Sequence, residues 1–148
     1  MIGARNVKAG LALIALSLVG GLVMSLYAFV PMIPVPTPLE HYDDLARRLL
    51  RLAHIAAVML PLLNVVFGLL LDRLRLSPGV QELSSFLLLA GAVGLPLALG
   101  AEALCPLARN WHLAGPPAVA FTLGTVLVAL GALRTPSEAL ISPRRPLT

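Results

Sequence analysis

The sequence predicts an all-α integral membrane protein, a four-helix transmembrane bundle whose N- and C-termini lie on the same side. Hydrophobic residues make up 58% of the chain and charged residues only 12%, whereas soluble domains contain roughly a quarter charged residues. The apolar residues form four stretches, each close to the length of about 20 residues that a helix needs to cross a bilayer. Continuous apolar runs without strict alternation favour helices over barrel strands.

The first predicted span covers roughly residues 9–33 and follows two basic residues, Arg5 and Lys8. Secretory signal peptides also have a basic start before an apolar run. However, this run is longer than a typical signal-peptide core, and no A-x-A-type cleavage site stands near its end. The stretch is therefore predicted to be a true membrane span.

The second predicted span, roughly residues 52–71, follows a helical extension and a proline-rich connection, PMIPVPTPLEHYDD. Proline fixes φ and disfavours helix in the residue before it, so the connection is expected to run extended along the membrane surface. Asp43 or Asp44 is expected to cap the helix that follows. Asp43 with Arg47 and Asp44 with Arg48 are acid-before-base pairs that stabilise the turns before the membrane.

The third and fourth predicted spans cover roughly residues 83–104 and 115–133. The sequence Ser-Pro-Gly at 77–79 marks a turn in the short link before the third span. Residues 134–148 are polar and contain prolines, so a flexible tail is expected there. The chain, 1–148, is thus predicted to form a single transmembrane domain.

The basic residues predict the orientation, because cytoplasmic loops carry an excess of Lys and Arg. With four spans both termini lie on one side, which holds seven of the 11 basic residues against four on the other. The termini are therefore predicted to be cytoplasmic, in a bacterial inner membrane. The charges lie at the span ends and form no stripe, so nucleic acid is not an expected partner. The seven are Arg5, Lys8, Arg73, Arg75, Arg134, Arg144 and Arg145; the four are Arg47, Arg48, Arg51 and Arg109.

Small residues spaced four apart allow membrane helices to approach closely. Ser17, Gly21 and Ser25 form such a stripe on the first span. The other spans carry Ala53, Ala57 and Pro61; Ala90, Gly94 and Ala98, continued by Glu102; and Gly124 with Gly131. These stripes predict a bundle, and one of them can also dock a neighbouring membrane protein.

Two prolines, Pro61 and Pro96, lie in the middle of the second and third spans. Each removes a backbone donor and frees the carbonyl four residues earlier, at Ala57 and Ala92. The simpler interpretation is a tolerated kink. The alternative is a bend that opens a cavity between these two spans.

The histidines all fall on the outer side of the predicted topology. His41 lies in the proline-rich connection, His54 about one turn inside the second span, and His112 before the fourth. Several charged residues are expected near the same depth: Glu102, Asp43, Asp44, Arg51 and Arg109. Ionisable residues within a membrane are functional candidates, although an interfacial imidazole bonded to a neighbouring helix is the simplest interpretation of His54.

One hypothesis for this cluster is a haem b site. A haem in a membrane bundle needs two axial ligands at one depth, which His54 and His112 can supply. Nearby arginines can pair with the propionates: Arg47, Arg51 and Arg109.

A second hypothesis is a quinone or quinol pocket near the outer face. His54 would exchange a hydrogen bond with the quinone oxygen, and Glu102 would relay a proton. Tyr42 and Trp111 can wall such a pocket, although aromatic residues at this depth more often form an interfacial belt.

A third hypothesis is a metal site, because imidazole and carboxylate suit zinc or copper. Its ligands would be His41, His54, His112 and a carboxylate such as Asp44. Asn64, deeper in the membrane, is expected to bond to a partner helix or to a freed carbonyl. The single cysteine, Cys105, excludes an intrachain disulfide.

Catalytic sequence motifs are not found, which argues against stand-alone catalysis without deciding it. The size and topology resemble small accessory or cofactor-holding subunits of bacterial respiratory and photosynthetic membrane complexes. The leading prediction is a small integral subunit that packs on and stabilises such a complex together with other subunits. The alternative is an electron-transport protein that binds haem b or quinone around His54. A transporter is less favoured, since charges are missing from the span centres.

Overall fold

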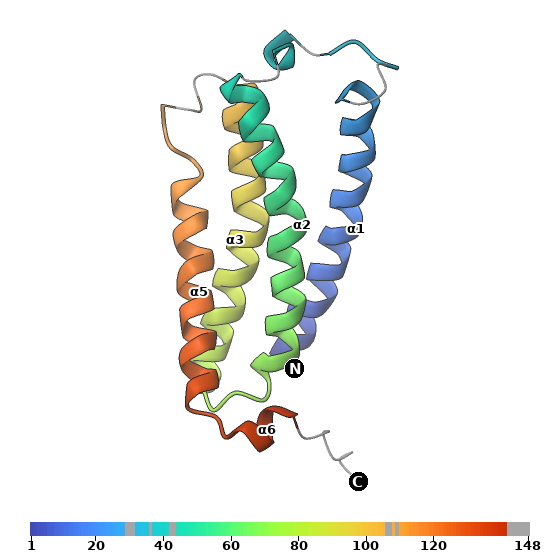
Figure 1. Ribbon diagram of the computed structural model, residues 1–148. Helices are drawn as coiled ribbons and strands as arrows, with labels where there is room; N and C mark the ends of the chain where they lie inside the picture. The colour runs from blue at the N-terminus through green and yellow to red at the C-terminus, as the bar shows by residue number, and fades with distance from the viewer. Residues whose placement is uncertain (29–31, 36, 42–43, 106–107, 109, 142–148) are drawn as a thin grey trace.

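The computed structural model describes residues 1–28, 32–35, 37–41, 44–105, 108 and 110–141. Figure 1 shows the long helices side by side, with a short helical segment at each end of the bundle. The long helices are α1 (Ile2–Ala28), α2 (Leu45–Leu71), α3 (Pro78–Leu104) and α5 (Gly115–Leu133). A 3₁₀ turn, η1 (Thr37–Leu39), precedes α2, and α6 (Ser137–Ile141) follows α5.

The predicted fold class is confirmed. All four long helices are apolar and long enough to cross a membrane, and the protein is an integral membrane protein. The start of α1 and the helix α6 lie at the same end of the bundle (Figure 1). Three helices begin earlier than the apolar stretches that marked them: α1 at Ile2, α2 at Leu45 and α3 at Pro78. Polar first turns therefore extend the helices beyond the hydrocarbon layer.

Helices α1 and α2 approach most closely near the N-terminus of α1. A Cβ added to Gly68 would lie 2.7 Å from the carbonyl oxygen of Gly3, so only glycine fits this contact. Toward the other end, the three atoms nearest to an added Cβ on Gly21 all belong to the His54 side chain. The two backbones thus touch at one end and are held apart by a side chain at the other.

Helices α3 and α5 pack through the small residues that the sequence pattern singled out. A Cβ added to Gly94 would lie 2.9 Å from Cβ of Pro117, and one added to Gly124 would lie 3.0 Å from Cγ of Leu88. These stripes therefore join helices of the same chain. The main buried cluster next to this seam contains Leu71, Leu74, Leu88, Ala92, Phe121 and Val128.

A buried polar network ties α1, α2 and α3 together. Asn6 Nδ2 donates to Asn64 Oδ1 at 2.7 Å, and Asn64 Nδ2 donates to the carbonyl oxygen of Leu88 at 3.0 Å. Ser85 Oγ donates to Asn6 Oδ1, and Arg5 Nη2 donates to Ser85 Oγ at 2.9 Å. The expected bonding of Asn64 across to a partner helix is confirmed. Each amide is satisfied, which avoids the cost of an unpaired polar group in an apolar medium.

The entry into α2 differs in part from the prediction. Asp44 occupies the N-cap position, but its side chain makes no capping hydrogen bond. It also forms no ion pair with Arg48, whose backbone N–H donates to the Asp44 carbonyl oxygen at 3.1 Å. Asp43 lies outside the described residues. Within the predicted flexible tail, residues 137–141 form α6, and residues 142–148 lie outside the described part.

Candidate functional site

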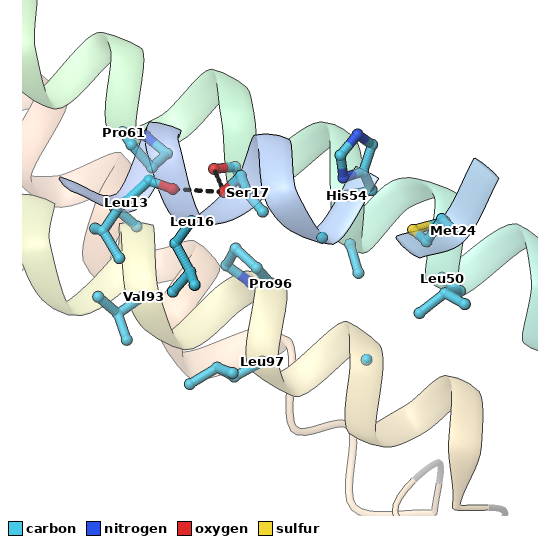
Figure 2. Close-up of a pocket in the computed structure, with 15 residues that line it drawn as sticks. Leu13, Leu16, Ser17, Met24, Leu50, His54, Pro61, Val93, Pro96 and Leu97 are labelled. Atoms are coloured by element: carbon cyan, nitrogen blue, oxygen red, sulfur yellow. Dashed lines mark hydrogen bonds between the residues drawn. The ribbon is translucent and has the colours of Figure 1, made fainter. Parts of the chain in front are cut away.

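A pocket of about 420 Å³ lies between α1, α2 and α3. Fifteen residues line it, five from each helix, and all but a few carry apolar side chains. Figure 2 shows Pro61, Ser17 and His54 following one another along one wall, with Val93, Pro96 and Leu97 of α3 facing them. Ser17 and His54 are the two lining residues with strong hydrogen-bonding side chains, since a methionine thioether is only a weak acceptor.

Two features of the sequence account for this pocket: small lining residues and a proline in the middle of both α2 and α3. Its lining includes small residues, and a Cβ added at Gly20 or Gly100 would meet no atom within 4 Å. Both mid-span prolines, Pro61 and Pro96, also lie in its wall. The structure thus has the cavity between the second and third spans that the alternative interpretation of these prolines predicted, with α1 as its third wall.

Ser17 compensates for the backbone donor that Pro61 lacks. Pro61 leaves the carbonyl of Ala57 without its helical N–H partner. Ser17 Oγ lies 2.5 Å from the Ala57 carbonyl oxygen and 2.7 Å from the carbonyl oxygen of Leu13 in its own helix. A hydroxyl has one hydrogen to donate, and both acceptors lie within its reach. The Ser17 hydroxyl is therefore committed to the backbone.

His54 is the polar group that remains available in the pocket. Its side chain is half-buried and lies against Gly21 of α1, whose missing Cβ makes room for the ring. Within the part of the chain that the structure describes, the imidazole has no hydrogen-bond or ion-pair partner. An imidazole carries a donor and an acceptor nitrogen, or two donors when protonated. The His54 side chain can therefore exchange a hydrogen bond with a ligand in the pocket.

The pocket reaches the side of the bundle that faces lipid. Leu16 of α1 and Leu97 of α3 both line it, and each is 68% exposed. Leucines this exposed on membrane-spanning helices meet acyl chains instead of water. An apolar molecule dissolved in the bilayer can therefore reach the pocket sideways.

The other predicted site residues that the structure describes do not line this pocket. Glu102 is buried, and its Oε1 accepts a hydrogen bond from the backbone N–H of Ala114 at 2.9 Å, at the start of α5. Arg47 donates from Nη1 to the carbonyl oxygen of Leu39 at 3.3 Å, and Arg51 is half-buried one turn before His54. Arg109 lies outside the described residues.

The histidines do not come together. His41 is exposed before α2, and His112 is exposed before α5 with a φ of 46°, in the left-handed region. Among the described residues, no group of three or more His, Cys, Asp or Glu side chains could hold a metal ion. Of the five described residues that were predicted to bind a cofactor, only His54 lines the pocket.

Sequence reasoning missed the contribution of the first helix. Ser17 and Gly21 stood out as a small-residue stripe, but a stripe signals close packing and not which helix it meets. Ser17 contacts Ala57 and Gly21 contacts His54, and both partners lie in α2. Ala57 belongs to the small-residue stripe of the second span, and His54 is the ionisable residue of that span. A small-residue stripe on the first span beside a stripe and an imidazole on the second was the signal that could have predicted this contact.

Comparison with known families shows which family the sequence resembles. The sequence model of the family described as styrene oxide isomerase matches residues 3–136, which include nearly all of the four long helices. No curated protein and no solved structure matches the chain.

This match corrects the functional predictions made from the sequence. The leading prediction, a subunit that packs on a larger respiratory or photosynthetic complex, is wrong because the matched family is an enzyme family. The alternative, an electron-transport protein that binds haem or quinone, is also wrong, since the family points to an isomerase. An isomerisation leaves the number of electrons in its substrate unchanged.

Proposed function

The chain belongs to the styrene oxide isomerase family, and from this membership we propose that it is a membrane enzyme that isomerises an aryl epoxide of the styrene oxide type. The observation that carries the proposal is His54, an imidazole without a partner among the described residues in an otherwise apolar pocket. We propose that this pocket is the active site and that His54 is its catalytic residue.

The size and lining of the pocket support an aryl substrate. A dry apolar cavity of about 150 Å³ is sufficient for benzene, and this pocket has about 420 Å³. That volume also lies within the range of roughly 300–1,000 Å³ that is typical of small-molecule sites. Leu13, Val93 and Leu97 offer an apolar surface to a phenyl ring.

The proposed chemistry needs one polar contact at the epoxide oxygen. The His54 N–H donates a hydrogen bond to that oxygen and stabilises the negative charge that develops on it. The bond between the oxygen and the ring-bearing carbon then breaks, since the aromatic ring stabilises the positive charge there. A hydrogen migrates with its electron pair from the neighbouring carbon, which becomes the carbonyl carbon. The product is an aldehyde with the formula of the substrate, and the proton remains on His54.

The scarcity of polar groups supports isomerisation over hydrolysis. Water that reached the opening epoxide would add to it and give a diol. Apart from His54, the described lining residues offer water only one strong hydrogen-bonding side chain, the Ser17 hydroxyl, which the backbone carbonyls of Leu13 and Ala57 already engage. A site that holds little water protects a reactive intermediate from such a side reaction.

The lipid-facing mouth supports the same substrate class. Styrene-type epoxides are apolar and accumulate in a bilayer, and Leu16 and Leu97 form an exposed edge of the pocket. Substrate would therefore enter from the hydrocarbon layer, and the aldehyde would leave by the same path.

The test is turnover by the purified full-length protein in lipid vesicles. Styrene oxide carrying two deuterium atoms on its terminal carbon is expected to give an aldehyde that keeps both, one on each carbon of the side chain. Gas chromatography with mass detection measures the product and its label. Vesicles without protein serve as the control. A diol, or an aldehyde in which solvent hydrogen replaces deuterium, would contradict the migration step, and no turnover would contradict the function.

The placement of the protein in the cell remains a proposal. The excess of basic residues on the side of the termini supports cytoplasmic termini in a bacterial inner membrane. Reporter fusions at the C-terminus and in the connection before α2 would test this orientation. Association with other membrane protein subunits stays a prediction, which cross-linking in native membranes would test.

A further inference from the structure

A second crevice, of about 340 Å³, lies at the opposite end of the bundle from His54, between the start of α1 and the end of α2. It is formed where Gly3 and Gly68 bring the two backbones into contact. Apolar and charged side chains share its lining, among them Val7, Lys8, Leu69, Asp72 and Arg73. Among the described residues that line the pocket around His54, by comparison, there is no Lys, Arg, Asp or Glu.

The charged groups of this crevice favour an anion. The carboxylate of Asp72 accepts a hydrogen bond from the backbone N–H of Gly3 at 3.1 Å, which ties it to the first turn of α1. Arg73 donates from Nη1 to the carbonyl oxygen of Leu140 at 2.6 Å, and this bond fixes the guanidinium beside the crevice. The bond uses one of five N–H donors, so the side chain can also bind a phosphate. Lys8 is exposed on the facing helix and adds a second cation.

The apolar part of the crevice faces lipid. Leu69 is 61% exposed, and Val7 is half-buried beside it. A helix of 27 residues such as α1 is about 40 Å long, which exceeds the hydrocarbon thickness of about 30 Å. The crevice lies at the helix ends, and hence at the depth of the lipid headgroups. The cations lie at the depth of a phospholipid headgroup, and the apolar side chains lie where its acyl chains run. The crevice therefore matches both parts of a phospholipid.

We propose that this crevice binds an anionic phospholipid. Lys8 and Arg73 contact the phosphate, and an acyl chain lies along Val7 and Leu69. A soluble phosphate would use the cations but not the wall, so the wall favours a lipid as the source of the phosphate. Basic pockets between membrane helices are known to bind anionic headgroups. The proposal does not depend on the isomerase activity, because the crevice contains no residue of the proposed active site.

Native mass spectrometry of the full-length protein in detergent tests the proposal, with equal amounts of phosphatidylglycerol and phosphatidylcholine added. The protein is expected to retain phosphatidylglycerol preferentially. Lys8→Gln and Arg73→Gln are each expected to lower its affinity on the order of fivefold, because one surface cation contributes about 1 kcal/mol to the binding of an anionic lipid. Arg134→Gln is the matched control, since Arg134 is exposed at the same end of the bundle but outside the crevice.

Three outcomes would overturn the proposal. The first is equal retention of the two lipids. The second is a loss of phosphatidylglycerol in Arg134→Gln as large as that in the crevice variants, which would indicate unspecific attraction to surface charge. The third is displacement of the lipid by millimolar inorganic phosphate, which would make the soluble anion the ligand.

Discussion

The imidazole of His54 lies against the bare Cα of Gly21, and a Cβ added there would come within 2.8 Å of the imidazole Cε1. This contact joins α2 to α1 at the point where the two backbones have moved apart. The imidazole lies at the edge of the apolar pocket, and a larger residue at position 21 would displace it by steric overlap.

We expect Gly21→Ala to lower turnover on the order of a hundredfold while the protein still folds. The atoms that the new methyl group meets belong to the His54 side chain and not to backbone. The imidazole ring is therefore expected to move, while the packing of α1 against α2 is kept. A displacement of about 1 Å at a catalytic group can have an effect of this size. Initial rates with styrene oxide measure it.

Gly79→Ala is the matched control for this substitution. It adds the same methyl group in the first turn of α3, where the new Cβ would meet no atom within 4 Å, and Gly79 is not among the residues that line the pocket. Full activity in Gly21→Ala would show that the position of the His54 ring does not matter.

Ser17→Ala is expected to destabilise the protein by about 1 kcal/mol, because the Ala57 carbonyl loses its substitute donor. Ser25→Ala is the control: its hydroxyl donates at 2.7 Å to the Leu22 carbonyl oxygen, within its own helix. Thermal unfolding in detergent compares the two. If both variants unfold at the same temperature, the bond to Ala57 contributes no stability.

The buried pair of Asn6 and Asn64 is expected to show energetic coupling. Removing either amide leaves the other with an unsatisfied group, so Asn6→Leu and Asn64→Leu should each destabilise, and the double variant by less than their sum. A coupling of about 0.6 to 2 kcal/mol is the range for hydrogen bonds between membrane helices. A double-mutant cycle of unfolding free energies measures it. Strict additivity would mean that the amides do not stabilise each other.

Glu102→Gln is expected to leave turnover unchanged. The side-chain oxygen of a glutamine can still accept the hydrogen bond from the Ala114 N–H, and Glu102 does not line the pocket. Glu102→Leu cannot accept that bond and should destabilise the start of α5. A large loss of turnover in Glu102→Gln without a loss of stability would give the carboxylate a chemical role, as in the proton relay first considered for it.

The membrane spans could be predicted from the sequence because the hydrocarbon layer requires nearly every residue of a span to be apolar. The helix ends could not, since hydropathy marks only the part of a helix that lies in hydrocarbon. Arg5, which precedes the predicted first span, lies inside α1 and forms an ion pair with Glu82 of α3 at 3.0 Å. Such polar turns continue the helix into the headgroup layer.

The sequence predicted two features of the candidate site: His54, and a cavity beside Pro61 and Pro96 as one of two interpretations of these prolines. Charged residues gather at the ends of the spans because ions are costly in lipid, so their positions do not mark the pocket. The pocket instead consists of apolar residues that three helices bring together, and Ser17 meets Ala57 across 40 positions of sequence. Periodicity shows that a helix has a small-residue face, but not which helix that face meets.

The most direct test of the account compares styrene oxide turnover by the wild-type protein, His54→Ala and His41→Ala in the same vesicles. His41 is exposed in the connection before α2 and outside the pocket, so it controls for the loss of an imidazole. We predict that His54→Ala lowers the rate at least on the order of a hundredfold, the contribution typical of a proton donor. His41→Ala is expected to turn over styrene oxide at the wild-type rate. A folded His54→Ala protein that isomerises styrene oxide at the wild-type rate would contradict the assignment of the active site.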